Sequence, residues 1–230
     1  MPLFYHQQST KNRQSYHQKE RKDFVQYFFS FLSFLRTFAA AMRKLKVTEM
    51  GRMSVEEFHA AQKLPLVVVL DNVRSLYNVG SIFRTGDAFR IAGICLCGIT
   101  ARPPHPEIHK TALGAEDSVS WQYYPDASEA VQSLKESGYT VLAIEQCEGS
   151  TMIQDFQSNR DQKYAVVLGN EVKGVQQSVI DQCDGCIEIP QFGTKHSMNV
   201  SVTAGIIIYT MHENLNFQNN RLSHKSKKRS

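Results

Sequence analysis

The stretch Leu66-Val67-Val68-Val69-Leu70 decides the fold class. A continuous apolar run without polar alternation is typical of a strand buried on both faces of a parallel sheet. Four more strands are predicted, at 92–99, 140–145, 164–168 and 185–189, and three helices, at 79–90, 128–137 and 197–212. Strands that alternate with helices predict an α/β domain, namely a parallel sheet with helices on both faces.

The composition is that of an ordinary globular protein with a mild excess of positive charge. The chain has 230 residues, of which 42% are hydrophobic and 21% charged, enough for one compact domain. The net charge of +4 and the pI of about 8.8 are compatible with a nucleic-acid partner but do not require one. The GxGxxG and GxxxxGK[ST] patterns are absent, which argues against the usual dinucleotide fingerprint and against a P-loop nucleotidase.

The two ends of the chain differ from its middle. We expect residues 1–41 to be a disordered or partly helical extension, 42–217 to be the folded domain and 218–230 to be a basic flexible tail. Residues 24–41 are apolar and follow basic residues, as in a signal peptide or membrane anchor. Polar residues interrupt the run, however, and a spanning helix needs about 20 apolar residues. An over-extended start codon, with Met42 as the true start, is the alternative origin of this segment.

The five cysteines form an odd, sparse set, which indicates buried thiols in a reducing compartment and therefore a cytoplasmic protein. Cys183-Asp-Gly-Cys186 is a CxxC pattern. Such a pattern can be a metal-binding or redox site, as an alternative to two buried thiols. No second pair or histidine stands at the spacing of a zinc site, so no metal is expected.

Three loops that follow predicted strands are rich in glycine and polar residues. Ligands of open α/β sheets bind at the carboxyl ends of the strands, so these loops are the candidate site. In the first loop, Asn78 is placed to cap a helix, Gly80 allows another backbone or a phosphate to approach, and Arg84 suits a phosphate. Without a ligand, the first loop could simply be the start of a capped helix that carries an arginine on its surface. The second loop is 168–174, with Glu171, and the third is 189–201.

These loops resemble, in order and spacing, the signature motifs of the SpoU/TrmH methyltransferases. NxGxxxR matches Asn78, Gly80 and Arg84, and LGxExxG matches 168–174. IPxxG followed by S-[LM]-N-V-S matches 189–201, and 110–116 resembles the family's KTALGAE segment. The resemblance covers roughly residues 64–213.

The resemblance implies a fold, a cofactor and an assembly. The C-terminal part of the sheet would be threaded as a trefoil knot, and the protein would act on RNA as a homodimer with its site near the subunit interface. S-adenosylmethionine would be held largely by backbone, with Met198 in place of the more usual leucine. The expected cofactor-binding residues are Leu168, Gly169, Gly174, Ile189 and Met198.

The expected reaction is transfer of the cofactor's methyl group to a ribose 2'-oxygen. The family assigns activation of the hydroxyl to the arginine that matches Arg84, but a guanidinium is effectively always protonated. Arg84 is therefore expected mainly to hold the adjacent phosphate and the 2'-hydroxyl. The expected catalytic set is Arg84, Asn78, Glu171, Ser197 and Asn199.

Two other functions compete with this one. A related knotted enzyme could methylate a base instead of a ribose, although the Asn-Arg, Glu and Ser-Asn set argues against it. A non-catalytic RNA-binding protein could keep the fold, although all the polar motif positions are present. Among RNA substrates, a short chain that relies on its own dimer surface favours tRNA over rRNA.

Overall fold

The computed structural model describes residues 25–30 and 43–215. The chain divides into two compact units, Met1–Arg52 and Met53–Ser230. Within the first unit, residues 25–30 are helical and a short 3-10 helix, η1, covers Val47–Glu49. Of the expected extension 1–41, only residues 25–30 are described, and the basic tail from 218 lies outside the described residues. The boundaries at 42 and 217 stay predictions. No helix in the described ranges is long and apolar enough to cross a bilayer.

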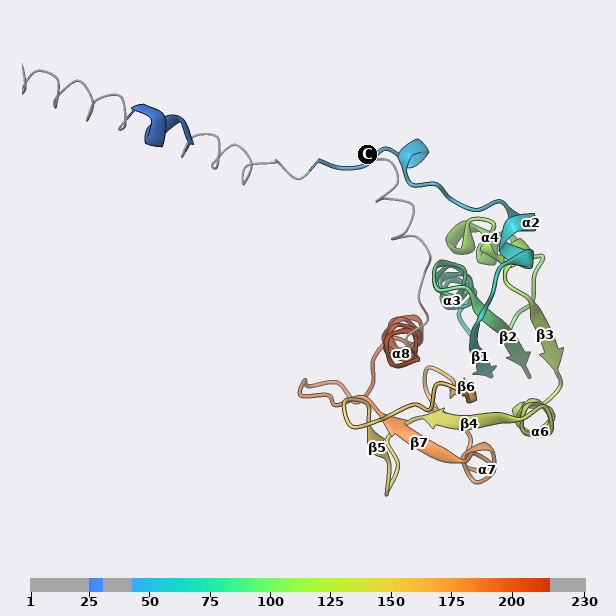
Figure 1. The fold of residues 1–230 in the computed structure, drawn as a ribbon. Coiled ribbons are helices and arrows are strands. Elements are labelled where there is room, and N and C mark those ends of the chain that lie inside the picture. The colour runs from blue at the N-terminus through green and yellow to red at the C-terminus, as the bar shows by residue number, and fades with distance from the viewer. Residues whose placement is uncertain (1–24, 31–42, 216–230) are drawn as a thin grey trace, which may run out of the picture. The chain divides into compact units, whose positions relative to one another are not determined.

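The second unit contains a seven-stranded sheet in the order β3-β2-β1-β6-β4-β7-β5, shown in Figure 1. Every pair of neighbouring strands is parallel. The strands are β1 (Leu64–Asp71), β2 (Ile91–Cys97), β3 (Trp121–Tyr124), β4 (Tyr139–Ile144), β5 (Thr151–Met152), β6 (Lys163–Leu168) and β7 (Gly185–Glu188). The predicted parallel sheet is confirmed.

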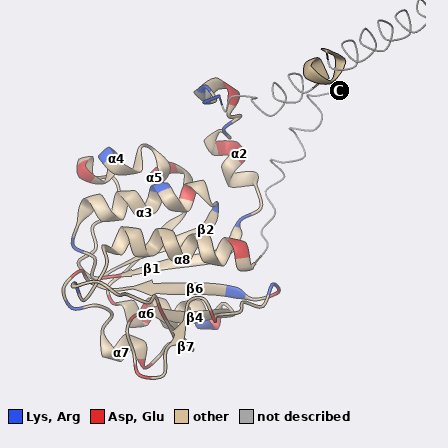
Figure 2. Ribbon diagram, turned by 90° about the vertical axis from the view of Figure 1, so that its left-hand side faces the viewer, with Lys and Arg blue, Asp and Glu red and all other residues tan. Residues whose placement is uncertain are grey.

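Helices cover both faces of this sheet, as predicted (Figure 2). One face carries α3 (Leu76–Ala88), α4 (Pro106–Ala112), α5 (Ala115–Ser118) and α8 (Val200–Asn214). The other carries α6 (Ala127–Glu136) and α7 (Gln177–Ile180), and α2 (Val55–Ala60) precedes the sheet in the chain. The alternation within β1 explains the two layers, because Leu66 and Val68 pack in the first core and Val67 and Val69 in the second.

The register of the central strands brings four loops to one edge of the sheet. Leu70 of β1 is paired with Leu168 of β6, and Ile144 of β4 with Ile187 of β7. Because these strands are parallel, their carboxyl ends lie together. The loops that begin after residues 71, 144, 168 and 188 therefore start at the same edge.

Candidate functional site

Glu171 joins the loop after β6 to the start of α3. Its carboxylate accepts hydrogen bonds from the backbone N–H groups of Arg74 at 2.9 Å and Ser75 at 3.0 Å. It also accepts one from the side-chain amide of Asn78 at 3.0 Å. Burial alone would raise the pKa of Glu171, but the hydrogen bonds from Arg74, Ser75 and Asn78 outweigh it, and the pKa is lowered. The carboxylate is thus held in its ionised form.

Asn78 and Asn199 extend this connection to the third loop. The side-chain amide of Asn199 donates to Asn78 Oδ1 at 3.2 Å. Asn199 is also the N-cap of α8, where its Oδ1 accepts from the backbone N–H groups of Ser201 and Val202. One chain of hydrogen bonds therefore runs from Glu171 through Asn78 to Asn199, and it joins residues that are more than 90 positions apart in the sequence.

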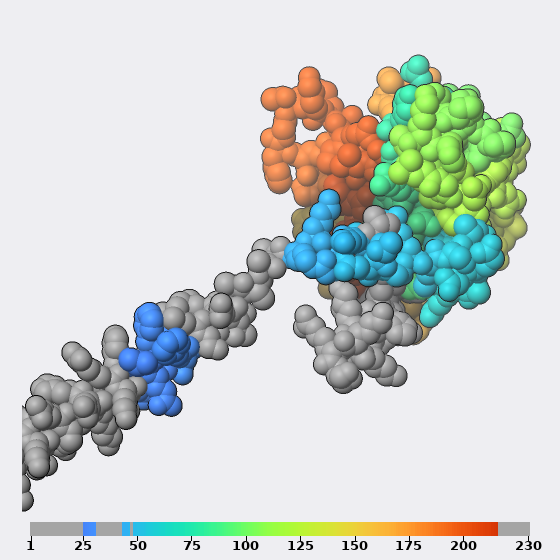
Figure 3. All heavy atoms as spheres, turned by 90° about the horizontal axis from the view of Figure 1, so that it is seen from above, coloured from blue at the N-terminus to red at the C-terminus, as the bar shows by residue number. Residues whose placement is uncertain are grey.

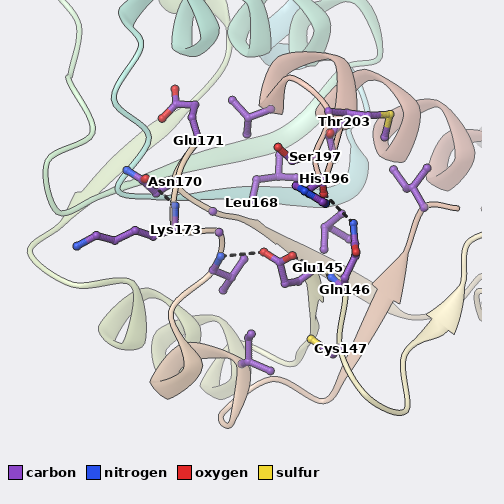
Figure 4. A pocket seen from close by; sticks show the side chains of 18 of the residues that line it. Glu145, Gln146, Cys147, Leu168, Asn170, Glu171, Lys173, His196, Ser197 and Thr203 are labelled. Carbon is purple, nitrogen blue, oxygen red and sulfur yellow. Dashed lines mark hydrogen bonds between the residues drawn. The ribbon is translucent and has the colours of Figure 1, made fainter. Parts of the chain in front are cut away.

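A cavity of about 860 Å³ opens beside Glu171 (Figure 4). All five residues predicted to bind the cofactor line it, and so do Glu171 and Ser197. Its apolar wall comes from side chains at the ends of β4 and β6 and in the third loop, namely Ile144, Leu168, Ile189, Met198 and Val200. The exposed part of the third loop, 192–197, carries Ser197, and the surrounding orange segment projects from the surface in Figure 3.

Glu145 and Gln146, which directly follow β4, hold the two cavity loops and were not predicted. Glu145 accepts from the backbone N–H of Val175 at 3.1 Å, and the side-chain amide of Gln146 donates to the carbonyl of His196 at 3.1 Å (Figure 4). A signal for them was present, because both are polar residues at the carboxyl end of the predicted strand 140–145. The three candidate loops predicted from the sequence do not include the one after this strand.

The backbone around Gly169 and Gly174 is too tight for side chains. Asn170 and Gly174 exchange two backbone hydrogen bonds, of 3.0 and 2.9 Å. A Cβ on Gly169 would lie 2.0 Å from the carbonyl carbon of Gly174, and Gly174 itself has a φ of +68°. Both glycines of the LGxExxG pattern are thus required by the shape of this turn.

Of two expectations about the first loop, the structure corrects one and confirms the other. Asn78 does not cap α3, because Ser75 is the N-cap and its side chain accepts from the backbone N–H of Asn78. Gly80 does allow a close approach, and what approaches is the backbone of α4, since a Cβ would meet the carbonyl oxygen of Ile108 at 2.3 Å.

Arg84 lies apart from the other predicted catalytic residues. It is the ninth residue of α3, so it does not share the helix end where Asn78 lies. Six residues of helix place it about 9 Å further along the axis. Its side chain is exposed and is not part of the cavity wall. The structure thus brings Asn78, Glu171, Ser197 and Asn199 to one region and leaves Arg84 on the surface of α3.

Asp71 is a fully buried carboxylate at the end of β1 to which no role was assigned. It accepts from the backbone N–H and the side-chain amide of Gln176, at 3.1 and 3.0 Å, and from the Asn72 amide at 2.7 Å. These contacts tie the first loop to the segment after Gly174. The signal in the sequence was an acidic residue directly after a buried strand.

The two cysteines of the CxxC pattern do not face one another as a pair. Cys183 donates to the carbonyl of Val179, and the sulfur of Cys186 lies 3.1 Å from that of Cys147. In the described part of the chain, no group of three or more His, Cys, Asp or Glu residues is placed to hold a metal ion.

Comparison with known proteins gives a consistent result. Residues 65–209 match the model of the SpoU rRNA Methylase family. The chain is 32% identical, over 70% of its length and 81% of the relative, to a tRNA (guanosine(18)-2'-O)-methyltransferase of Thermus thermophilus. It is 28% identical, over 63% of its length, to a 23S rRNA (guanosine-2'-O-)-methyltransferase of Neisseria meningitidis serogroup B, of which it spans 56%.

A solved structure shares the fold. It is an AdoMet-bound rRNA methyltransferase from Sinorhizobium meliloti, with a TM-score of 0.60 and 24% identity. The match covers 67% of this chain and 61% of that one.

Proposed function

The chain belongs to the SpoU rRNA methylase family, and from this premise we propose that it transfers a methyl group from S-adenosylmethionine to a ribose 2'-oxygen of tRNA. The observation that carries the proposal is the chain of hydrogen bonds from Glu171 through Asn78 to Asn199, at the edge of a cavity lined by the predicted cofactor residues. These hydrogen bonds bring together three motifs that are distant in the sequence.

The residues of the cavity fit S-adenosylmethionine. The volume of about 860 Å³ is within the range of small-molecule sites. Ile144, Leu168 and Met198 offer an apolar wall for a purine ring. The turn at Gly169 exposes backbone where a side chain has no room, which suits recognition of a ribose by backbone groups. When bound, S-adenosylmethionine supplies a methyl group on a positively charged sulfur that an oxygen nucleophile can displace.

Glu171, Asn78 and Asn199 act as positioning residues. The carboxylate of Glu171 is occupied by backbone and amide donors, and its pKa is lowered, so it is a weak proton acceptor at neutral pH. Asn78 and Asn199 fix the first loop against the start of α8. Ser197 has an exposed hydroxyl on the cavity wall and contacts the ribose. Holding the reacting groups in place lowers the barrier to methyl transfer.

The protein acts as a homodimer in which Arg84 serves the partner's cavity. Arg84 lies seven residues after Tyr77, so both side chains project from one side of α3. Val202 and Tyr209, on the neighbouring α8, are likewise seven residues apart. Tyr77, Val202 and Tyr209 are each about half exposed, so a second subunit that packs on α3 and α8 would cover them. The permanently charged guanidinium of Arg84 then holds the RNA phosphate beside the 2'-hydroxyl.

The choice of tRNA is supported by sequence identity. The chain is 32% identical to the tRNA enzyme of Thermus thermophilus and 28% identical to the rRNA enzyme of Neisseria meningitidis.

The test is to incubate the full chain with methyl-labelled S-adenosylmethionine and either total tRNA or rRNA. The products are digested to nucleosides and identified by mass spectrometry. We expect 2'-O-methylated nucleosides in tRNA, and no product from Arg84→Ala although that variant still binds the cofactor. Label on a base, or label confined to rRNA, would contradict the proposal. Failure to bind S-adenosylmethionine would favour a non-catalytic RNA-binding protein.

A further inference from the structure

Two cysteine sulfurs meet at the edge of the cavity. Cys186 lies in β7 and Cys147 in the loop after β4, and β4 and β7 are neighbours in the sheet. Their sulfur atoms are 3.1 Å apart. A disulfide bond is about 2.0 Å long, so the two sulfurs need to approach by only about 1 Å. Cys147 lines the cavity, and Cys186 is half-buried behind it.

We propose that Cys147 and Cys186 are a reversible oxidation site, and that their disulfide weakens binding of the methyl donor in the adjoining cavity. The part of this inference that concerns cofactor affinity rests on the proposed function. The formation of the disulfide does not, because it depends only on the two thiols.

The loop that carries Cys147 is the one that holds both cavity loops. Glu145 accepts from the backbone N–H of Val175, and Gln146 donates to the carbonyl of His196. These contacts belong to the two residues directly before Cys147. Drawing Cys147 toward β7 therefore moves Glu145 and Gln146, and it loosens the turn at Gly174 and the third loop together.

The two thiols differ in a way that sets the order of the reaction. Burial raises the pKa of Cys186 to about 12, and its S–H donates to the carbonyl of Glu145. Cys186 is therefore a thiol at neutral pH, while Cys147 is the thiol that a small oxidant meets in the cavity.

Hydrogen peroxide is the oxidant in the proposed reaction. The Cys147 thiol releases its proton, and the thiolate attacks one peroxide oxygen, so that the O–O bond breaks and a sulfenic acid and hydroxide form. That hydroxide takes up the released proton and becomes the first water. The sulfur of Cys186 then attacks the sulfur of Cys147 and displaces hydroxide, which takes up the Cys186 proton as water. In sum, two thiols and one peroxide give one disulfide and two waters, and an added thiol reverses the step by exchange.

Cys183 provides a matched control, because it belongs to the CxxC pattern but not to the pair. Its sulfur is hydrogen-bonded to the carbonyl of Val179 within its own turn. Burial raises the pKa of Cys183 to about 11, so it too is a protonated thiol at neutral pH. Loss of Cys183 should leave the oxidation of the other two unchanged.

The experiment treats the full chain with hydrogen peroxide, blocks free thiols with iodoacetamide and maps the cross-links by mass spectrometry of peptides. Affinity for S-adenosylmethionine is measured by titration calorimetry before oxidation, after oxidation and after reduction. We expect a Cys147–Cys186 cross-link and an affinity weakened by about tenfold, or about 1.4 kcal/mol, that reductant restores. Cys147→Ser and Cys186→Ser should abolish the dependence on oxidant, and Cys183→Ser should keep it.

Three results would overturn the inference. They are a Cys183–Cys186 cross-link in place of the expected one, no cross-link to Cys147 at all, and a cross-link that leaves the affinity unchanged. A reduced protein that does not bind S-adenosylmethionine would instead overturn the proposed function. The mapped cross-link would then still establish the oxidation site, although its link to cofactor affinity would fail with the proposed function.

Discussion

At Gly169, the backbone leaves β6 and turns so sharply that it touches the chain five residues further on. A Cβ at this position would lie 2.0 Å from the carbonyl carbon of Gly174 and 2.1 Å from the backbone nitrogen of Val175. Neither of these atoms can move without shifting the turn. Gly193, in the third loop, offers the opposite case, because no atom lies within 4 Å of a Cβ built there.

We expect Gly169→Ala to destabilise the protein by about 1–3 kcal/mol, the usual cost of forcing an atom into a filled space. It should also weaken binding of S-adenosylmethionine, because the turn forms part of the cavity wall. Gly193→Ala should change neither quantity. Urea denaturation and titration calorimetry measure the two effects. Equal behaviour of the two variants would show that the turn at Gly169 does not shape the site.

Single residues also show what the sequence could and could not predict about the site. The motif positions Leu168, Gly169, Ile189 and Met198 do line one cavity, because parallel strands bring their carboxyl ends together. The capping role predicted for Asn78 was wrong, since Ser75 and Asn78 are both good caps and sequence alone does not choose between them. The choice is made by Glu171, which engages the Asn78 amide from 93 residues away.

At the scale of elements, one side chain at the start of α8, that of Asn199, has two functions. Asn199 caps the helix through its Oδ1 and reaches Asn78 through its amide group. Asp126 caps α6 in the same way, by accepting from the backbone N–H of Ser128 at 2.7 Å, and α6 packs on the opposite face of the sheet. The two caps should therefore contribute similarly to the stability of the protein. Only the cap at Asn199 is also connected to the candidate site.

We expect Asn199→Ala and Asp126→Ala each to destabilise the protein by about 1 kcal/mol, the typical cost of losing a cap. Only Asn199→Ala should also lower the rate of methyl transfer, because it alone cuts the connection to Asn78. Denaturation curves and initial rates on tRNA give the comparison. A similar fall in rate for Asp126→Ala would mean that stability, and not the connection between loops, controls the reaction.

The elements that the sequence did not predict are short or lack a continuous buried pattern. The strands at 64–71, 139–144 and 163–168 are buried apolar runs, and they were recognised within a few residues. The edge strand β3 contains exposed and half-buried side chains, so no buried pattern marks it, and β5 has only two residues. The short helices α4 and α5 fall in a segment that was recognised as a motif but not as secondary structure.

For the whole molecule, the position of Arg84 supports the proposal that a second subunit completes the site. Arg84 does not line the cavity of its own subunit, although its motif is intact. The half-exposed Tyr77, Val202 and Tyr209 on α3 and α8 would be covered in a two-fold dimer. The sequence could not show that Arg84 lies outside the cavity wall, because the wall is formed by loops that are distant in the sequence. The threading of the C-terminal part as a knot likewise follows from family resemblance, and it stays a prediction.

We expect Tyr209→Glu to give monomers in sedimentation equilibrium and to abolish methyl transfer.

Mixing two inactive variants tests directly whether Arg84 completes the site of the partner subunit. After dissociation and random reassociation, an equal mixture of the Arg84→Ala variant and the Ser197→Ala variant should recover about a quarter of wild-type activity. The reason is that half of the dimers contain one subunit of each variant, and each of these mixed dimers has one intact site. If Arg84 served its own subunit, the mixture would stay inactive, since no site would then contain both residues.

The central claim is that the loops after β4, β6 and β7 together bind the methyl donor. Hydrogen–deuterium exchange, measured with and without saturating S-adenosylmethionine, tests this claim most directly. The account predicts slower exchange in three segments, 145–148, 169–175 and 189–199, and unchanged exchange in 103–121, which lines a separate surface hollow. Saturable binding that leaves those three segments unprotected, or that protects 103–121 instead, would contradict it.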